Sequence, residues 1–299
     1  MNQITMESIL EKRHDVLCKE VLCYKFVLAM IMKHTLKEFK EYSIDDITNL
    51  IGNNDNEKVI GIQNAFPSHE YDVLFTTKFP KSQNEFDMLV DMEPQKLVKL
   101  GYQLHNRGIF YVGNEIAYQY GRVFDQSKYD KILPVVSIFI GMNAPSKEEE
   151  NSLAHFHLTK ENEIGYNGVS EEEYDKIRII IIYLGKQPSN HPLFQFLNFI
   201  FKSNIQIEDK VRKLKDEYGI QTSESFKEEV REMNSILDYY KQQGIEQGIE
   251  KGIEKGQFEA LLSAIKNVMK NTNVDETTAM KNIGIQEKDY PIYLEALKK

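Results

Sequence analysis

The spacing of hydrophobic and polar residues changes along the chain. From residue 5 to residue 43, apolar residues recur every three or four positions without glycine or proline, which predicts a helix. Ser43, followed by Asp45 and Asp46, is typical of an N-cap and predicts a short second helix. Residues 71 to 95 contain two runs rich in β-branched and aromatic residues around the turn cluster PKSQN, which predicts a β-hairpin.

Helical spacing returns after the hairpin, over residues 96 to 120. Two nearly continuous apolar runs follow, LPVVSIFIGM at 133–142 and IRIIIIYLG at 177–185. Short runs of this kind are typical of central strands that are buried on both faces. The order helix, hairpin, helix, strand, strand therefore predicts an α/β or α+β sheet domain that ends near residue 190, at the turn QPSNHP.

The rest of the chain is predicted to be helical. Residues 191–243 form a helical extension, residues 244–256 contain the repeat GIEQGIEKGIEKG, and residues 257–299 form a helical pair. Each glycine of the repeat costs a helix about 1 kcal/mol, so another interaction should offset it. Self-association through closely packed helices is one interpretation, and a flexible helical connector is the other.

The predicted hairpin carries acids where strands are expected. If residues 81–84 form its loop, Asp72 faces Glu93, and alternation places Asp91 and Gln95 on the same face. Adjacent carboxylates repel each other and resist ionisation, and Mg²⁺ typically binds one or two carboxylates together with waters and a phosphate. The acids are therefore either a Mg²⁺ site or the solvent-facing side of an amphipathic hairpin.

The net charge, the cysteines and the apolar runs limit the kinds of binding partner and the cellular compartment that we expect. The net charge of −9 argues against a surface coated with basic residues for non-specific nucleic-acid binding. Cys18 and Cys23 are poorly spaced for a disulfide on one helix, which indicates a reducing compartment. The first residues carry charges where a signal peptide is apolar, and no run is long enough to span a bilayer. We expect a cytoplasmic protein without a membrane partner.

Motifs for other chemistries are missing from the sequence. The seven histidines show no His-x-x-x-His pattern, and His155 and His157 stand in a stretch that reads as a loop, so the sequence does not predict a zinc site. No phosphate-binding glycine loop and no nucleophile elbow occurs.

The hairpin pattern resembles that of a known family. An Asp followed by Glu-x-Gln on a hairpin, with a helix directly after it, resembles the PD-(D/E)XK nuclease superfamily, in the recombination-promoting nuclease branch whose members are also labelled transposases. Further matching segments occur in order along nearly the whole chain. They are YDVLF (71–75), VDMEPQ (90–95), GYQLHNRGIFY (101–111), YDKILPVVSIFIGMNAP (129–145), LTKENEIG (158–165), IIIYLG (180–185) and the glycine repeat.

The resemblance implies a restriction-endonuclease-like core with a mixed sheet over residues 1–190. It implies a Mg²⁺-dependent DNA endonuclease that hydrolyses phosphodiester bonds, linked to recombination or to a mobile element. Asp72 and Glu93 become the metal ligands, and Gln95 takes the place of the usual catalytic lysine. Pro94 stands where the family has a small residue, which is consistent with a strand that stops at that point.

The segment after the hairpin is the predicted DNA-binding surface. Residues 96–131 contain six basic and three acidic residues, a local charge of +3, with tyrosines between them. We assign DNA binding to Lys96, Lys99, Arg107 and Tyr111, where Arg107 contacts a phosphate or pairs with an acid. Alternatively, the tyrosines belong to the core and the charges to an ordinary helix face.

A second function from a different class is also compatible with these residues. It is a non-catalytic DNA-binding or assembly protein on a degenerate nuclease fold.

Overall fold

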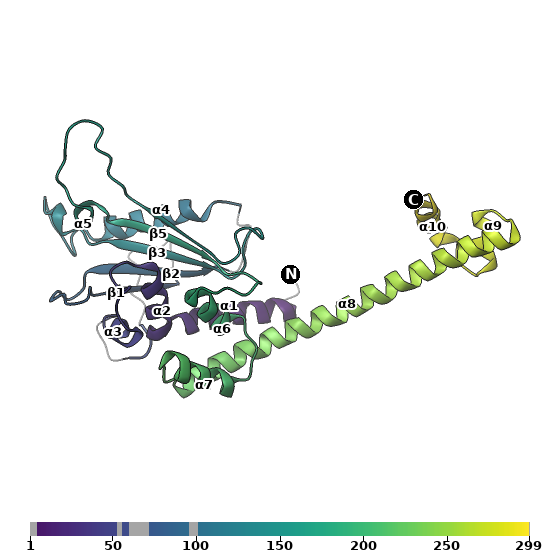
Figure 1. The fold of residues 1–299 in the computed structure, drawn as a ribbon, viewed down its shortest axis with the longest axis horizontal. Coiled ribbons are helices and arrows are strands. Elements are labelled where there is room, and N and C mark those ends of the chain that lie inside the picture. The colour runs from purple at the N-terminus through teal and green to yellow at the C-terminus, as the bar shows by residue number, and fades with distance from the viewer. Residues whose placement is uncertain (1–4, 53–55, 60–71, 96–100, 299) are drawn as a thin grey trace. The chain divides into compact units, whose positions relative to one another are not determined.

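The computed structural model describes residues 5–52, 56–59, 72–95 and 101–298 (Figure 1). The chain divides into two compact units, Met1–Ile236 and Leu237–Lys299. The first unit contains a sheet and most of the helices. The helices of the chain are α1 (Met6–Leu22), α2 (Lys25–Thr35), α3 (Ile44–Thr48), α4 (Leu104–Tyr118), α5 (Glu171–Tyr174), α6 (Pro192–Phe201), α7 (Ile207–Tyr218), α8 (Glu224–Thr272), α9 (Glu276–Asn282) and α10 (Tyr290–Leu297).

The sheet is mixed and has five strands in the order β1-β2-β3-β5-β4. Its strands are β1 (Val73–Thr77), β2 (Met88–Gln95), β3 (Val135–Gly141), β4 (Ser152–His157) and β5 (Ile177–Tyr183). The three central strands β2, β3 and β5 are parallel, and the two edge strands are antiparallel to their neighbours. The predicted α/β class and the two predicted central strands are therefore confirmed.

Helices cover both faces of the sheet, with α4 on one side and α1, α2 and α6 on the other (Figure 1). On the α4 side, Val112 packs in one core cluster with Phe139 of β3 and Ile179 of β5. The close approach depends on Gly108, because a Cβ at this position would lie 2.6 Å from the Ile179 side chain. The spacing of apolar residues thus places α4 directly over the central strands.

The single helix expected over residues 5–43 is wrong. The chain leaves the helix at Tyr24, whose backbone is extended, and α2 ends at Thr35. Lys25 N donates to Glu57 O at 2.9 Å, and Tyr24 is fully buried with its ring edge against Phe226, 5.0 Å away. These long-range contacts override the local helical spacing.

The second predicted helix start is confirmed. The Ser43 hydroxyl accepts from Asp46 N, and the Asp46 carboxylate accepts from Ser43 N, so the two residues form a capping box at the start of α3.

The hairpin has the predicted register and a longer loop. Val73 pairs with Met92, and Thr77 pairs with Met88, which places Asp72 opposite Glu93. The strands end earlier than a four-residue loop requires, because the Asp87 carboxylate organises the connection and accepts from Phe79 N at 2.7 Å and from Asn84 Nδ2 at 2.6 Å.

Pro94 does not end the strand. β2 continues to Gln95, whose carbonyl accepts from Met142 N at 2.9 Å. Main-chain groups of successive strand residues point to alternate neighbours, so the nitrogen of Pro94 faces the β1 side, beyond the last pair Val73–Met92. The proline therefore removes no hydrogen bond from the ladder with β3.

Two other boundaries differ from the sequence expectation. The stretch that contains His155 and His157 is not a loop: it forms edge strand β4, which pairs with β5. Most of its residues are exposed, which explains the weak hydrophobic signal. The helix expected from residue 96 begins at Leu104, and residues 96–100 lie outside the described residues.

The helices that follow residue 190 belong to the first unit as far as Ile236. Fully buried Lys210 of α7 joins them, because its ammonium group donates to Ile200 O (3.1 Å) and Ser203 O (2.8 Å) near the end of α6 and to Asn234 Oδ1 (3.3 Å) of α8. Burial lowers the pKa of Lys210 to about 8. The predicted boundaries between the sheet domain, the helical extension, the repeat and the C-terminal helical pair, at residues 190, 243 and 256, stay predictions.

The second unit has its own small core. Ile265 of α8 is buried together with Met280 of α9 and Tyr293 of α10, and the rings of Phe258 and Tyr293 stack 4.9 Å apart. Gly284 follows α9 with a φ of +81°, a conformation that favours glycine. In the part of the chain that the structure describes, none of the helices combines the length and the apolar character that crossing a membrane requires.

Candidate active site

The acids of β2 lie beneath α4. Asp91 and Glu93 belong to the face of β2 that continues through Phe139 and Ile179 on the neighbouring strands. Each acid is only 1% exposed. The alternative of a solvent-facing hairpin is therefore wrong, because α4 covers this face of the sheet.

Asp72 and Glu93 meet at the open end of the hairpin. Asp72 lies one residue before β1, and its main-chain nitrogen donates to Glu93 Oε1 at 3.0 Å. The antiparallel register brings the two residues together, as the sequence predicted.

Arg107 of α4 connects the other members of the predicted site. Its Nη2 donates to Glu93 Oε2 at 2.6 Å, and its Nη1 donates to Gln95 Oε1 at 3.1 Å. Its Nε donates to the hydroxyl of Tyr111 at 2.8 Å, and the guanidinium carbon lies 4.9 Å from the centre of the Tyr111 ring. Of the two roles considered for Arg107, pairing with an acid is the one observed here.

Lys19 is a site residue that the sequence analysis missed. It lies on α1, and its Nζ is 2.5 Å from Asp72 Oδ1. More than fifty residues separate the two in sequence, so no local motif signals the contact. Lys19 and Arg107 together place two cations on the paired acids.

Ser137 is a second residue that was missed. The parallel register sets it beside Asp91, and its hydroxyl donates to Asp91 Oδ2 at 2.7 Å. A lone serine inside an otherwise apolar strand is the signal that could have revealed it. The other oxygen of Asp91, Oδ1, is buried and has no hydrogen-bond partner among the described residues.

Burial changes the ionisation of all three acids. It raises the pKa of Glu93 to about 7, to which the charge of Asp72 adds, while Arg107 opposes the shift. Burial and the charge of Glu93 raise the pKa of Asp91 well above its usual range. Burial also raises the pKa of Asp72, against the effect of Lys19. With its pKa near 7, Glu93 therefore keeps a proton at mildly acidic pH that a carboxyl group in water would release.

Asp72 and Glu93 offer carboxylate oxygens, the type of donor that a hard divalent cation takes. Carboxylate oxygens of Asp72 and Glu93 are ligands that Mg²⁺ prefers, and Mg²⁺ is usually held by one or two protein carboxylates. The unpartnered oxygen of Asp91 marks a buried acceptor that a cation or a proton would satisfy. A bound ion would also offset the charge of Asp72, which adds to the effect of burial in raising the pKa of Glu93.

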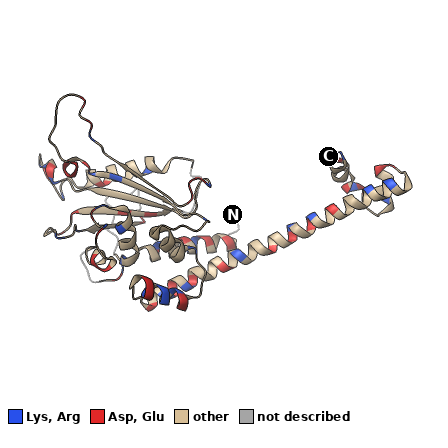
Figure 2. Cartoon of the chain, in the orientation of Figure 1, with Lys and Arg blue, Asp and Glu red and all other residues tan. Residues whose placement is uncertain are grey.

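The predicted DNA-binding surface is described only in part. Lys96 and Lys99 lie outside the described residues, and Tyr111 is buried against Arg107. Lys128 pairs with Asp125 at 2.7 Å. Positions occupied by Lys or Arg and positions occupied by Asp or Glu are intermixed along the chain (Figure 2).

The tyrosines of this segment divide between core and surface. Tyr102, Tyr120 and Tyr129 are 50–61% exposed, so the alternative that the tyrosines form the core does not hold for these three. They remain available for stacking on a partner.

Comparisons with known proteins return no match. Neither the family models nor the curated proteins nor the solved structures compared contain a match to this chain.

Proposed function

We propose that the chain is a metal-dependent DNA endonuclease of the PD-(D/E)XK type, with a restriction-endonuclease-like core. The observation that carries the proposal is the meeting of Asp72 and Glu93 at the end of one hairpin, with Gln95 joined to Glu93 through Arg107. Buried, mutually repelling carboxylates with raised pKa values are typical of functional sites. A role in recombination or in a mobile element belongs to the same proposal.

In this proposal Asp72 and Glu93 hold Mg²⁺. When bound, the ion polarises a water molecule and neutralises charge on the scissile phosphate. The Gln95 amide orients the water, because it lies two residues beyond Glu93 on the same face of β2. Lys19 and Arg107, which pair with Asp72 and Glu93, would present N–H donors to phosphate oxygens if a cation balanced the charges of these acids.

A plasmid assay tests this function. Supercoiled DNA is incubated with the full chain in Mg²⁺ or in EDTA, and nicked and linear products are measured. We expect cleavage in Mg²⁺, none in EDTA, and at least about a 100-fold loss in Glu93→Gln, because the variant removes a metal charge. Asp209→Asn is the matched control, because this carboxylate on α7 is 52% exposed and lies outside both the site and the predicted DNA-binding surface. Equal cleavage by the parent and Glu93→Gln would remove Glu93 from catalysis.

A non-catalytic DNA-binding or assembly protein is the second candidate. The observation in its favour is that Lys19 and Arg107 already pair with Asp72 and Glu93, so the acids have cationic partners without a metal. Calorimetry separates the two candidates. The nuclease requires Mg²⁺ binding that Asp72→Asn weakens, whereas the second candidate binds DNA without a Mg²⁺ site.

DNA binding itself is tested through its salt dependence. Replacing Lys96 and Lys99 by alanine should lower the slope of log affinity against log salt by about two units, roughly one for each lost phosphate contact. The matched control is the pair Lys251 and Lys255 of the repeat. An unchanged slope would place the DNA elsewhere on the protein.

We also propose that the repeat helix mediates self-association. Ile245, Ile249 and Ile253 of α8 are 47–58% exposed, and they form one stripe beside the glycines. Glu follows the isoleucine in each of the three repeats, and Lys follows the Glu in the second and third, so a second copy of the helix would offer both an apolar stripe and opposite charges.

A further inference from the structure

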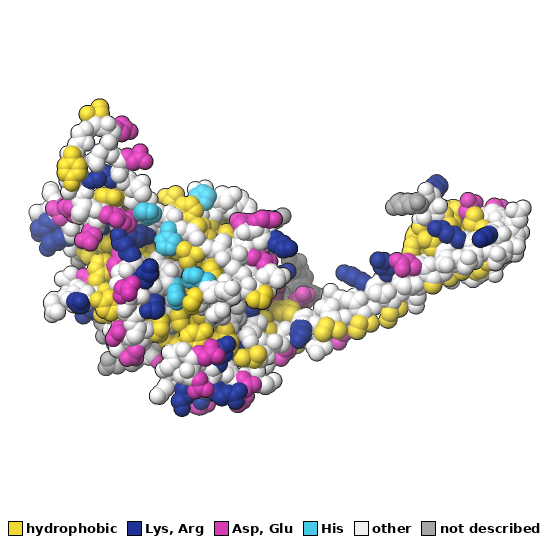
Figure 3. Space-filling model, viewed as in Figure 1, with side chains coloured by type: hydrophobic (Ala, Val, Ile, Leu, Met, Phe, Trp, Pro, Cys, Tyr) yellow, Lys and Arg dark blue, Asp and Glu magenta, His cyan; other side chains and the backbone are white. Residues whose placement is uncertain are grey.

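A second site lies on the face of the sheet opposite α4. A cavity of about 480 Å³ is bounded by α2, β4, α5 and the start of α6. Four histidines line it, two of them on alternate positions of β4. Histidine side chains gather on this face among lysines and arginines (Figure 3). The histidines are His34, His155, His157 and His191.

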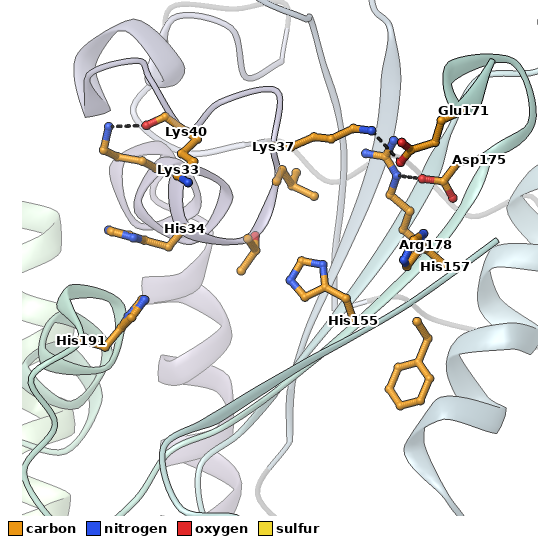
Figure 4. A pocket seen from close by; sticks show the side chains of 13 residues that line it. Lys33, His34, Lys37, Lys40, His155, His157, Glu171, Asp175, Arg178 and His191 are labelled. Atoms are coloured by element: carbon orange, nitrogen blue, oxygen red, sulfur yellow. Dashed lines mark hydrogen bonds and ion pairs between the residues drawn. The ribbon is translucent and has the colours of Figure 1, made fainter. Parts of the chain in front are cut away.

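Three side chains at one end of this cavity could hold a metal ion. Ligand atoms of His157, Glu171 and Asp175 all lie within 4.8 Å of one another. Figure 4 shows Glu171, Asp175 and His157 together at one side of the cavity, and His34 and His191 at the other. The pocket therefore has a distinct cluster at one side.

The fold brings these three residues together across a long connection. His157 is the last residue of β4, and Glu171 is the first residue of α5. A capping box between Ser170 and Glu173 starts α5, and the spacing of four residues puts Glu171 and Asp175 on one side of this turn.

Asp175 is already oriented as metal ligands usually are. It is only 3% exposed, and it accepts from Arg178 Nε at 2.8 Å and from Leu158 N at 3.3 Å. The charge of Arg178 is shared with Glu38, whose Oε1 lies 2.6 Å from its Nη1. Hydrogen bonds of this kind fix the orientation of a ligating carboxylate and leave lone pairs free.

We propose that His157, Glu171 and Asp175 bind a transition-metal cation such as Zn²⁺. A set of one imidazole and two carboxylates suits Zn²⁺, whereas Mg²⁺ takes oxygen ligands. Three protein ligands leave a position open toward the cavity, as in sites that bind water or a further ligand. The site is separate from the proposed nuclease centre, because it lies on the other face of the sheet.

The competing ion pair is weak. Lys37 lies 2.7 Å from Glu171, but the two side chains are 53% and 48% exposed. Exposed ion pairs contribute little to stability, so a divalent cation displaces Lys37 at small cost. Arg178 remains in place between Asp175 and Glu38.

Metal binding would join the two ends of the long loop formed by residues 158–170. The ligands stand immediately before and after residues 158–170, in which Ile164 is 97% exposed and Tyr166 is 87% exposed. Bridging its two ends restricts the conformations that this segment can adopt. The metal would therefore regulate how the loop presents Ile164 and Tyr166, its two most exposed apolar side chains.

Binding of Zn²⁺ to the full metal-free chain tests the proposal by calorimetry, and Co²⁺ serves as a visible-absorption probe of an imidazole–carboxylate site. We expect one Zn²⁺ per chain, and at least a tenfold weaker binding in His157→Ala and in Asp175→Asn. His34→Ala is the matched control, because His34 lines the same cavity without belonging to the cluster. Absence of binding in the parent, or equal binding by parent and His157→Ala, would overturn the proposal.

A second measurement guards against misfolded variants. His157 is exposed, so His157→Ala should melt near the parent without metal. Zn²⁺ should slow proteolysis of the 158–170 loop at least threefold in the parent and in His34→Ala, but not in His157→Ala. Equal protection of all three proteins would contradict the site. None of these readouts depends on DNA cleavage, so failure of the nuclease proposal leaves the test intact.

Discussion

Arg107 and Glu93 form an ion pair of 2.6 Å in which the carboxylate is almost fully buried and the guanidinium is only 23% exposed. The pair connects α4 to β2, and it competes with any cation for the same oxygen. The contribution of this pair to the free energy of unfolding and the protonation of Glu93 can both be measured.

Removing the Arg107 side chain while Glu93 stays in place should destabilise the fold. Arg107→Ala leaves Glu93 buried without its cation, and we expect a loss of about 2–3 kcal/mol at pH 8, measured by urea denaturation. The loss should be smaller at pH 6, because Glu93 then binds a proton. The double variant Arg107→Ala/Glu93→Gln should recover part of the loss. A double variant no more stable than Arg107→Ala at pH 8 would contradict the buried-charge explanation.

Stability of the metal-free chain should fall as the pH rises from about 4.5 to about 7. Burial raises the pKa of Glu93 to about 7, so the folded state binds a proton that the unfolded state releases near its ordinary pKa of 4.5. Protonated Glu93 makes its full contribution to the free energy of unfolding below pH 4.5, the unfolded-state pKa. This contribution is lost as the pH rises through the folded-state pKa of about 7. Its upper limit is about 3 kcal/mol.

Glu93→Gln should flatten this part of the profile, because the amide does not titrate in this range. Urea denaturation at pH 4.5, 6, 7 and 8 checks the prediction, with Asp125→Asn as the exposed control. A parent profile that rises across this interval while that of Glu93→Gln stays level would show that the pKa of Glu93 is not raised.

Pro94→Ala should leave the cleavage rate within about twofold of the parent. Its nitrogen faces away from β3, and the strand already continues through Gln95, so a new N–H adds no bond to the β3 ladder. Single-turnover cleavage of plasmid DNA measures the effect. A large increase would mean that the proline displaces Gln95, and a large decrease would mean that the proline sets its position.

Lys210→Met should destabilise the first unit by about 2–4 kcal/mol. The methionine fills a similar volume but leaves the carbonyls of Ile200 and Ser203 without their buried donor. Lys213→Met on the same helix is the control, because this lysine is 42% exposed. Similar urea midpoints for both variants would show that the buried ammonium makes no net contribution.

Ile249→Glu should weaken self-association at least tenfold in sedimentation analysis. The change places a charge in the middle of the exposed isoleucine stripe of α8. Gln247→Glu adds the same charge on another side of the helix and should associate like the parent. If the parent sediments as a monomer even at high concentration, self-association through the repeat is contradicted and the helical connector is the remaining interpretation.

The part of the site that the sequence alone determined is the part encoded within one hairpin. Side chains alternate along a strand, and the predicted register places Asp72 opposite Glu93 with Gln95 on the same face, although the observed loop is longer than four residues. The buried strands β3 and β5 and the capped helix start at Ser43 depend on equally local signals.

Tertiary structure determined the contacts between segments that are far apart in the sequence. Packing of α4 buried the acids, and the same packing brought Arg107 to Glu93. Docking of α1 supplied Lys19 to Asp72, and the pairing of β4 with β5 turned an apparent loop into a strand. These contacts depend on the free energy of burial and pairing between segments, and the spacing of residues within any one segment carries no record of the partner.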